Sequence, residues 1–174
     1  ARLTDRYITK DPPSKENLRN LEEYVDEKLT EVIQSIGRRK FSSVVGTGGT
    51  IINLASIAYE LKEGRPLRLR GYYKLSQDEF WKLRRKMAGM SERELRKLPG
   101  LDRKRSDIIL AGGVFAALLF KRLKIGSILV SDKGIREGLI LDHMMRSQMG
   151  LKRPKPSLKV QWFGQKPFFS GKIL

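Results

Sequence analysis

The chain has 174 residues, of which 40% are hydrophobic and 32% are charged, with a formal net charge of +17 at pH 7. This composition is typical of a folded globular domain with a sizeable core rather than of a disordered chain. With zero cysteines and no apolar run near the roughly 20 residues of a membrane helix, disulfides, thiolate zinc sites and membrane spans are excluded. We therefore expect a cytoplasmic protein with no membrane partner.

The positive charge is unevenly distributed along the chain. Residues 1–60 carry nine Lys and Arg against nine Asp and Glu, so the whole surplus lies in residues 61–174. A one-sided surplus of this size attracts polyanions over long range, although most single lysines in it belong to an ordinary solvated surface.

The first elements predicted along the chain are two helices and a strand. Ser14, after Asp11-Pro12-Pro13, predicts a helix start, and apolar residues at helical spacing continue to a stop at Gly37. Phe41–Val45 is expected as a short strand that enters a glycine-rich turn. An apolar helix is expected over Thr50–Leu61, ended by Gly64 and Pro66.

The central part of the chain is predicted to be mainly helical. A strand is expected over Arg70–Leu75, followed by two capping boxes, Ser76 to Glu79 and Ser91 to Glu94, that begin helices. Asp102 is expected to cap a further helix that is almost wholly apolar from Ile108 to Leu119. Two glycines inside that helix, Gly112 and Gly113, indicate a close packing contact.

The last predicted elements are a strand over Ser127–Val130 and a helix from about Gly134 to Met149. Residues 150–174, basic and rich in Pro and aromatic side chains, are expected to form a tail. Strands alternating with helices predict a helix-rich α/β fold with a small, mostly parallel sheet. The strands are few for so many helices, as expected if other strands of the sheet lie outside this chain.

Two strand–glycine–helix segments are candidate phosphate loops: Val44–Thr50 and Val130–Gly138. Such turns point backbone N–H groups at the space above the strand end, where they suit an anion. In the first we predict ligand contact by Gly46, Gly48, Gly49 and Thr50, with Thr50 also capping the helix. The alternative is that these glycines only form the tight turn.

Arg105 is the side chain that we predict to contact a ligand. Arg103, Lys104 and Arg105 occupy a predicted helix start, where the helix dipole disfavours cations, so three of them there indicate a bound anion. A guanidinium also matches phosphate in a bidentate way. The alternative is an ion pair of Arg105 with Asp102 or Asp107.

Three residues of the second loop are candidates for an interface, a hinge or a metal-bound water: Asp132, Arg136 and Glu137. A helix cap is the alternative role for Asp132. Because the chain has one histidine, His143, and no cysteine, a zinc site or a Ser-His-Asp triad within it is not expected. His143 is predicted to be a helix-surface residue or a packing residue.

Four segments, in order along residues 1 to about 145, resemble the exopolyphosphatase/guanosine pentaphosphate phosphohydrolase (Ppx/GppA phosphatase) family. They are Arg2–Tyr7 with Asp11–Ser14, Val45–Ile51 with Leu54–Ala55, Gly100–Asp102 with Arg105–Gly112, and Val130–Asp132 with Gly134–Ile140. In the third segment Ser106 stands where the family usually has alanine. Each segment alone is a weak signal, but four in family order are a strong one.

The resemblance implies a ribonuclease-H-like (actin- and hexokinase-type) second domain over residues 1–149, incomplete and without its leading strands. It also implies removal of terminal phosphate from inorganic polyphosphate or guanosine pentaphosphate, with Mg²⁺. The family's water-activating carboxylate and the ligands of Mg²⁺ would lie in an N-terminal domain that precedes this chain. We therefore expect no catalytic residue here and no activity from the chain alone; a homodimer is a candidate assembly.

Two functional hypotheses follow. The first is the substrate-binding half of such a phosphohydrolase. The second is a non-enzymatic, basic nucleic-acid-binding module, which the net charge and the tail favour. Because no helix-turn-helix, RNA-recognition or zinc-finger signature is apparent, we do not expect nucleic acid to be a partner.

Overall fold

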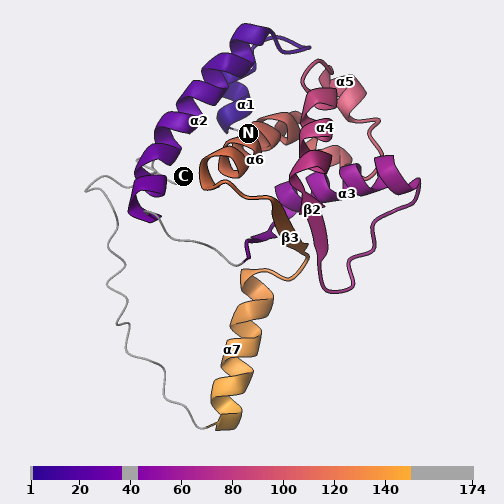
Figure 1. Ribbon diagram of the computed structural model, residues 1–174. Coiled ribbons are helices and arrows are strands. Elements are labelled where there is room, and N and C mark those ends of the chain that lie inside the picture. Colours follow the sequence, from indigo (N-terminus) through magenta and orange to yellow (C-terminus); the bar gives the residue numbers. More distant parts are fainter. Residues whose placement is uncertain (1, 37–42, 150–174) are drawn as a thin grey trace, which may run out of the picture. The chain divides into compact units, whose positions relative to one another are not determined.

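The computed structural model describes residues 2–36 and 43–149, which fall into two units (Figure 1). The first unit extends to Gly134 and the second begins at Ile135. The elements are α1 (Arg2–Tyr7), α2 (Lys15–Ile36), β1 (Val45–Thr47), α3 (Gly49–Glu63), β2 (Tyr73–Ser76), α4 (Gln77–Met87), α5 (Glu92–Leu95), a 3₁₀ turn η1 (Arg103–Arg105), α6 (Ser106–Leu123), β3 (Ser127–Ser131) and α7 (Ile135–Met149). Of the second unit, the structure describes α7.

The first unit contains a three-stranded sheet with the order β1-β3-β2. β1 and β3 are parallel, with Thr47 opposite Ser131, whereas β2 and β3 are antiparallel, with Leu75 opposite Ile128. The α/β prediction is confirmed and the parallel pair is present, but the sheet is mixed. The direction of β2 depends on the path of the whole connection after α3, and the strand sequence alone does not determine it.

Helix α6 lies in the centre of the first unit, between α2 and the α3–α4 pair (Figure 1). One face packs against α2, where Leu21 and Val25 are buried beside Val114. The other face packs against α3, α4 and the sheet, where the rings of Phe80 and Phe120 stack with centroids 4.8 Å apart. Burial on both faces explains why this helix is apolar almost all round.

The predicted helix signals are confirmed at several positions. The Ser14 hydroxyl accepts a hydrogen bond from the Asn17 amide at 3.1 Å, at the start of α2. Ser76 and Ser91 each form a complete capping box, at the starts of α4 and α5. Asp102, which is predicted to cap the apolar helix α6, instead caps the 3₁₀ turn η1 before it, through a bond from the Lys104 amide. Local sequence patterns determine these ends because cap and partner are within three residues.

Some predicted boundaries are wrong. The strand expected over Phe41–Val45 is observed as β1, which begins at Val45 and includes Gly46. The predicted beginning of this strand lies outside the described residues. Gly37 and the tail 150–174 also lie outside them. The strand expected from Arg70 begins only at Tyr73. Strand ends depend on the partner strand: β1 is defined by its pairing with β3, and β2 by its pairing along the other edge of β3.

Glu79 links α4 to its surroundings. Its carboxylate accepts hydrogen bonds from the Ser76 amide (3.0 Å) and hydroxyl (2.8 Å), the Lys62 ammonium (3.1 Å) and the Tyr73 hydroxyl (3.1 Å). Burial by itself would raise the pKa of Glu79, but the hydrogen bonds from Ser76, Lys62 and Tyr73 outweigh it and lower the pKa.

We expect Glu79→Gln to make the free energy of unfolding depend less on pH in the acid range. Because the folded pKa is lowered, the bonds of Glu79 stabilise the fold above the unfolded pKa of about 4.3, and this stabilisation is lost as pH falls through the folded pKa. The free energy of unfolding of the variant, from urea titrations at several pH values, should be lower than wild type at neutral pH and should fall less steeply on acidification. An equally steep fall would contradict the prediction.

Ser76→Ala removes the hydroxyl that donates to Glu79, and it should lower the free energy of unfolding by about 1 kcal/mol.

Candidate functional site

The two glycine turns of the sequence meet at one edge of the sheet. Because β1 and β3 are parallel and Thr47 pairs with Ser131, their carboxyl ends lie side by side. Gly48 and Gly49 follow β1 at this edge, and Asp132 follows β3. In α/β folds ligands bind outside the carboxyl ends of parallel strands, so this edge is the candidate site.

Gly48 shapes the turn from β1 into α3. Its φ of 100° and ψ of 161° belong to a region that essentially only glycine adopts. Gly48 is the N-cap of α3, and no side chain of the described residues caps this helix end. The first intrahelical bond comes from the Ile52 amide to the Gly48 carbonyl at 3.2 Å. The amides of the preceding first turn are therefore available to an anion, where the helix dipole favours negative charge.

Thr50 does not cap α3, contrary to the prediction, because it lies inside the helix as its second residue. Its methyl group packs against Gly112 of α6, where any added Cβ would collide with it. The predicted close contact at the two glycines is thus confirmed, since Gly113 likewise faces the Met87 side chain. Packing on α6 fixes where α3 begins relative to the sheet.

Gly46 lies within β1, and the space beside it is filled. A Cβ there would lie 2.9 Å from Cγ2 of Ile128 and 3.0 Å from Cγ1 of Ile51. Glycine at this position allows α3 to pack closely on the sheet. A backbone contact of Gly46 with ligand stays a prediction.

Arg105 reaches the glycine turn from η1. Its guanidinium lies directly against Gly49, in the space that a side chain at that position would occupy. About a third of the Arg105 side chain is exposed, and within residues 2–36 and 43–149 its ion pair is with Asp102, at 4.0 Å between Nε and Oδ2. That distance is too long for a hydrogen bond. The pairing with Asp102 is present but weak, and it leaves the guanidinium donors free to bind an anion above Gly49.

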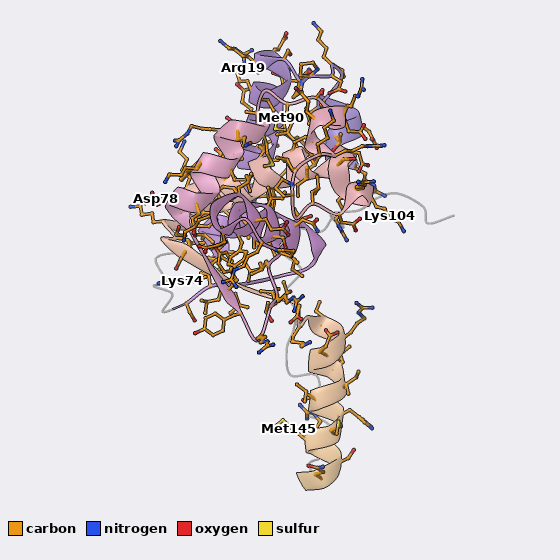
Figure 2. All side chains as sticks on the ribbon, turned by 90° about the vertical axis from the view of Figure 1, so that its right-hand side faces the viewer. Arg19, Lys74, Asp78, Met90, Lys104 and Met145 are labelled. Carbon is orange, nitrogen blue, oxygen red and sulfur yellow. The ribbon has the colours of Figure 1, made fainter. Side chains whose placement is uncertain are left out.

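The predicted helix start at Arg103–Arg105 is a 3₁₀ turn, and α6 begins only at Ser106 with Arg105 as its N-cap. The three cations therefore precede α6 rather than occupying its first turn. Arg103 and Lys104 are exposed, and Lys104 points away from the fold in Figure 2. Arg105 differs from them in turning toward α3.

Asn53 is a site residue that the sequence did not reveal. Its buried side chain donates from Nδ2 to the Gly49 carbonyl at 2.8 Å and accepts from the Asp102 amide at Oδ1, at 2.6 Å. The Asn53 side chain thus connects the glycine turn to the segment that carries Arg105. Asp102, its partner in that segment, lies 49 residues after Asn53 in the chain. A polar residue in an otherwise apolar stretch of α3 was the only signal.

Asp132 is exposed, and its Oδ2 lies 3.4 Å from the Lys133 ammonium. Arg136 and Glu137 belong to the first turn of α7, in the second unit. The structure therefore brings together Gly48, Gly49, Arg105 and Asp132 around one edge of the sheet. The roles of Asp132, Arg136 and Glu137 at an interface, a hinge or a metal-bound water stay predictions.

Within the described ranges, no three His, Asp or Glu side chains are grouped as a metal site would require. Asp132 as a lone carboxylate does not make one. His143 is exposed on α7, as predicted. None of the described helices has the length and apolar character needed to cross a bilayer.

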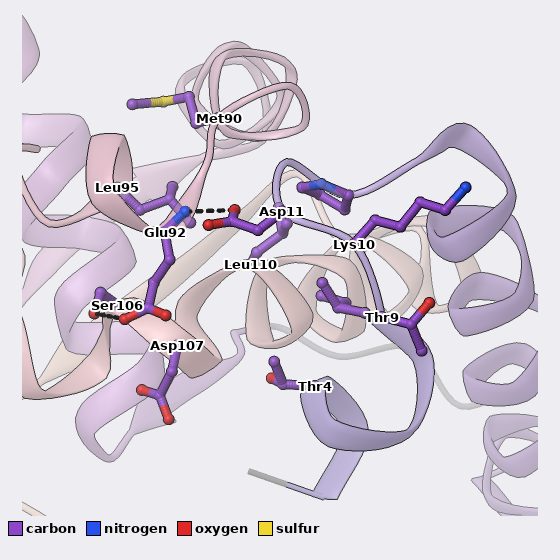
Figure 3. A pocket seen from close by; sticks show the side chains of 12 residues that line it. Thr4, Thr9, Lys10, Asp11, Met90, Glu92, Leu95, Ser106, Asp107 and Leu110 are labelled. Atoms are coloured by element: carbon purple, nitrogen blue, oxygen red, sulfur yellow. Dashed lines mark hydrogen bonds between the residues drawn. The ribbon is translucent and has the colours of Figure 1, made fainter.

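A separate cavity of about 180 Å³ lies beside α1, α5 and α6 (Figure 3). Carboxylates of Asp11, Glu92 and Asp107 line it, and Asp11 accepts a hydrogen bond from the Glu92 amide at 2.8 Å. The Ser106 hydroxyl donates to Glu92 at 3.1 Å, a bond that alanine at this position would lack. Its acidic lining makes this cavity unsuitable for phosphate.

A sequence model of the Ppx/GppA phosphatase family matches residues 1–147. No curated protein sequence matches the chain significantly. Among solved structures, the Ppx/GppA family member of Aquifex aeolicus is 24% identical, with a TM-score of 0.72 over 84% of this chain and 46% of its own. An exopolyphosphatase from Cytophaga hutchinsonii is also 24% identical, with a TM-score of 0.72 over 87% of this chain and 47% of its own. An exopolyphosphatase-like protein is 25% identical, with a TM-score of 0.72.

These likenesses show a shared fold, and the chain spans about half the length of the structures that it matches. The matched region contains the glycine turn, Asn53, Arg105 and Asp132.

Proposed function

The chain belongs to the Ppx/GppA phosphatase family, and from this we propose that it forms the substrate-binding half of a phosphohydrolase. The substrate would be inorganic polyphosphate or guanosine pentaphosphate, from which the enzyme removes the terminal phosphate. The helix-rich α/β fold matches part of the actin-like fold of this family. Two of the structural neighbours are an exopolyphosphatase and an exopolyphosphatase-like protein, which supports this substrate class.

The observation that carries the proposal is the contact of the Arg105 guanidinium with Gly49, at the N-terminus of α3. First-turn amides and a guanidinium at one place provide both donors and positive charge for phosphate oxygens. Phosphoryl transfer depends mainly on positioning and on neutralising charge in the transition state. In this proposal the amides hold a phosphate group, and Arg105 neutralises negative charge that develops on it.

We place the water-activating carboxylate outside this chain, in the half that the solved relatives have in addition. We place the ligands of Mg²⁺ there as well, because the described carboxylates form no metal-binding group. Mg²⁺ typically binds one or two carboxylates together with substrate phosphates, and its chemistry there would be to neutralise charge on those oxygens. Asp132 remains a candidate for contact with a metal-bound water.

Phosphate release from long-chain polyphosphate with Mg²⁺ tests this division of labour. We expect the chain alone to release no phosphate but to bind tripolyphosphate, and the chain joined to an N-terminal half from a family member to hydrolyse polyphosphate. Activity of the chain alone would contradict the proposal and direct attention to Asp132 and Glu137. Failure to bind tripolyphosphate would remove its substrate-binding role.

A further inference from the structure

A cationic strip lies on the connection between α3 and β2 and on β2 itself. It comprises Arg68, Arg70, Tyr72 and Lys74, all exposed. The residues between them turn inward: Leu67 and Leu69 are partly buried before the bend at Gly71, and Tyr73 and Leu75 are partly or fully buried after it. On β2 this alternation puts Lys74 on the outward side of the strand, and before the bend it leaves Arg68 and Arg70 exposed. Lys74 lies at the outer margin of the unit in Figure 2.

Arg68, Arg70 and Lys74 have no ion-pair partner among the described residues. From Gly64 to Gln77 the chain has no Asp or Glu. Among the residues that the structure describes, no carboxylate forms an ion pair with the strip, and the nearby Glu79 is already bonded to Lys62, Ser76 and Tyr73. Unpaired arginines and a lysine in succession are complementary to the phosphates of a polyanion.

The exposed ring of Tyr72 favours nucleic acid over polyphosphate as the polyanion that binds the strip. Tyr72 is 66% exposed, whereas the neighbouring Tyr73 packs edge-on against Tyr59, with ring centroids 5.5 Å apart, and bonds to Glu79. Polyphosphate has no group that would cover the Tyr72 ring. A nucleic-acid strand has both phosphates for the cations and flat bases for the ring, and proteins that bind single strands combine these two features.

We propose that the strip Arg68–Arg70–Tyr72–Lys74 is a binding surface for single-stranded nucleic acid. Phosphates of the strand contact Arg68, Arg70 and Lys74, and one base stacks on Tyr72. This role is separate from phosphate binding at the Gly49–Arg105 edge, and it does not rest on the proposed hydrolase function.

Fluorescence anisotropy of the purified chain with labelled oligo-uridine and oligo-thymidine of about 15 nucleotides tests the proposal. The triple variant Arg68→Gln/Arg70→Gln/Lys74→Gln should weaken binding and make the slope of log K against log salt shallower by about 2. Tyr72→Ala should weaken binding by about tenfold or more, and Tyr72→Phe, which keeps the ring, should bind as wild type does. Because these residues are exposed, the variants should keep the wild-type thermal unfolding.

A charge-matched control is Arg93→Gln/Lys97→Gln/Lys121→Gln, three exposed cations outside the strip. An equal loss in this control would show that only net charge matters, and it would overturn the proposal. The same follows if Tyr72→Ala binds as wild type, or if neither oligonucleotide binds. If the strip variants lose labelled polyphosphate and not oligonucleotide, the surface is a polyphosphate site instead. Loss of oligonucleotide binding with unchanged tripolyphosphate binding would support the proposal.

Discussion

Arg105→Ala should weaken the binding of inorganic tripolyphosphate by about 10- to 100-fold, the largest effect that we expect from a single side chain. The guanidinium lies against Gly49 at the free end of α3, and its remaining ion pair, with Asp102, is 4.0 Å long. A hydrogen bond to a charged group contributes about 1.5–3 kcal/mol, which corresponds to this loss. Isothermal titration calorimetry of the chain with tripolyphosphate measures it.

Two variants separate the position of Arg105 from its charge. Arg103→Ala removes an exposed cation from the same 3₁₀ turn and should change affinity only slightly. Arg105→Lys keeps the charge but loses the planar fork, so it should recover only part of the affinity. If Arg103→Ala weakens binding as much as Arg105→Ala, the charge of the turn is sufficient and the guanidinium geometry is irrelevant.

Gly49→Ala tests the contact between Gly49 and the Arg105 guanidinium by changing Gly49. The added methyl would occupy the space of the guanidinium, and the flexible Arg105 side chain can move away. Gly49 is helical, and alanine is a good helix former, so stability should change little. The variant should therefore lose affinity for tripolyphosphate while its thermal unfolding stays near that of wild type.

Features with short-range causes could be predicted from the sequence. The capping boxes at Ser76 and Ser91 are present where predicted, because each depends on residues three positions apart. The tight turn at Gly48 was predictable for a similar reason, since it requires a positive φ. The apolar character of α6 reflected its burial on two faces.

Features that depend on residues far apart in the chain were not predictable from local patterns. The antiparallel pairing of β2 and the start of β1 depend on β3, which lies more than fifty residues beyond either strand. The sequence predicts a turn glycine at Gly49, but its backbone is helical and its missing side chain makes room for Arg105. The family resemblance includes both segments, and the fold shows that they touch.

The contact between those segments depends on Asn53, and Asn53→Ala should both destabilise the fold and weaken tripolyphosphate binding. The buried amide bonds the Gly49 carbonyl and the Asp102 amide. Without it the Asp102 amide loses its partner, which costs about 1–3 kcal/mol. The segment that carries Arg105 would also lose a fixed position relative to Gly49. Urea unfolding and calorimetry with tripolyphosphate measure the two effects.

Asn20→Ala is the matched control, because it makes the same chemical change at an exposed position of α2 and should alter stability by no more than about 0.5 kcal/mol. Asn53→Asp gives a sharper test. A carboxylate can still accept from the Asp102 amide, but it cannot donate to the Gly49 carbonyl, and it places a buried charge near the Asp102 carboxylate. Both Asn53 variants should therefore be less stable than wild type. An Asn53→Ala protein with wild-type stability and affinity would show that packing of Thr50 on Gly112 alone aligns the two segments.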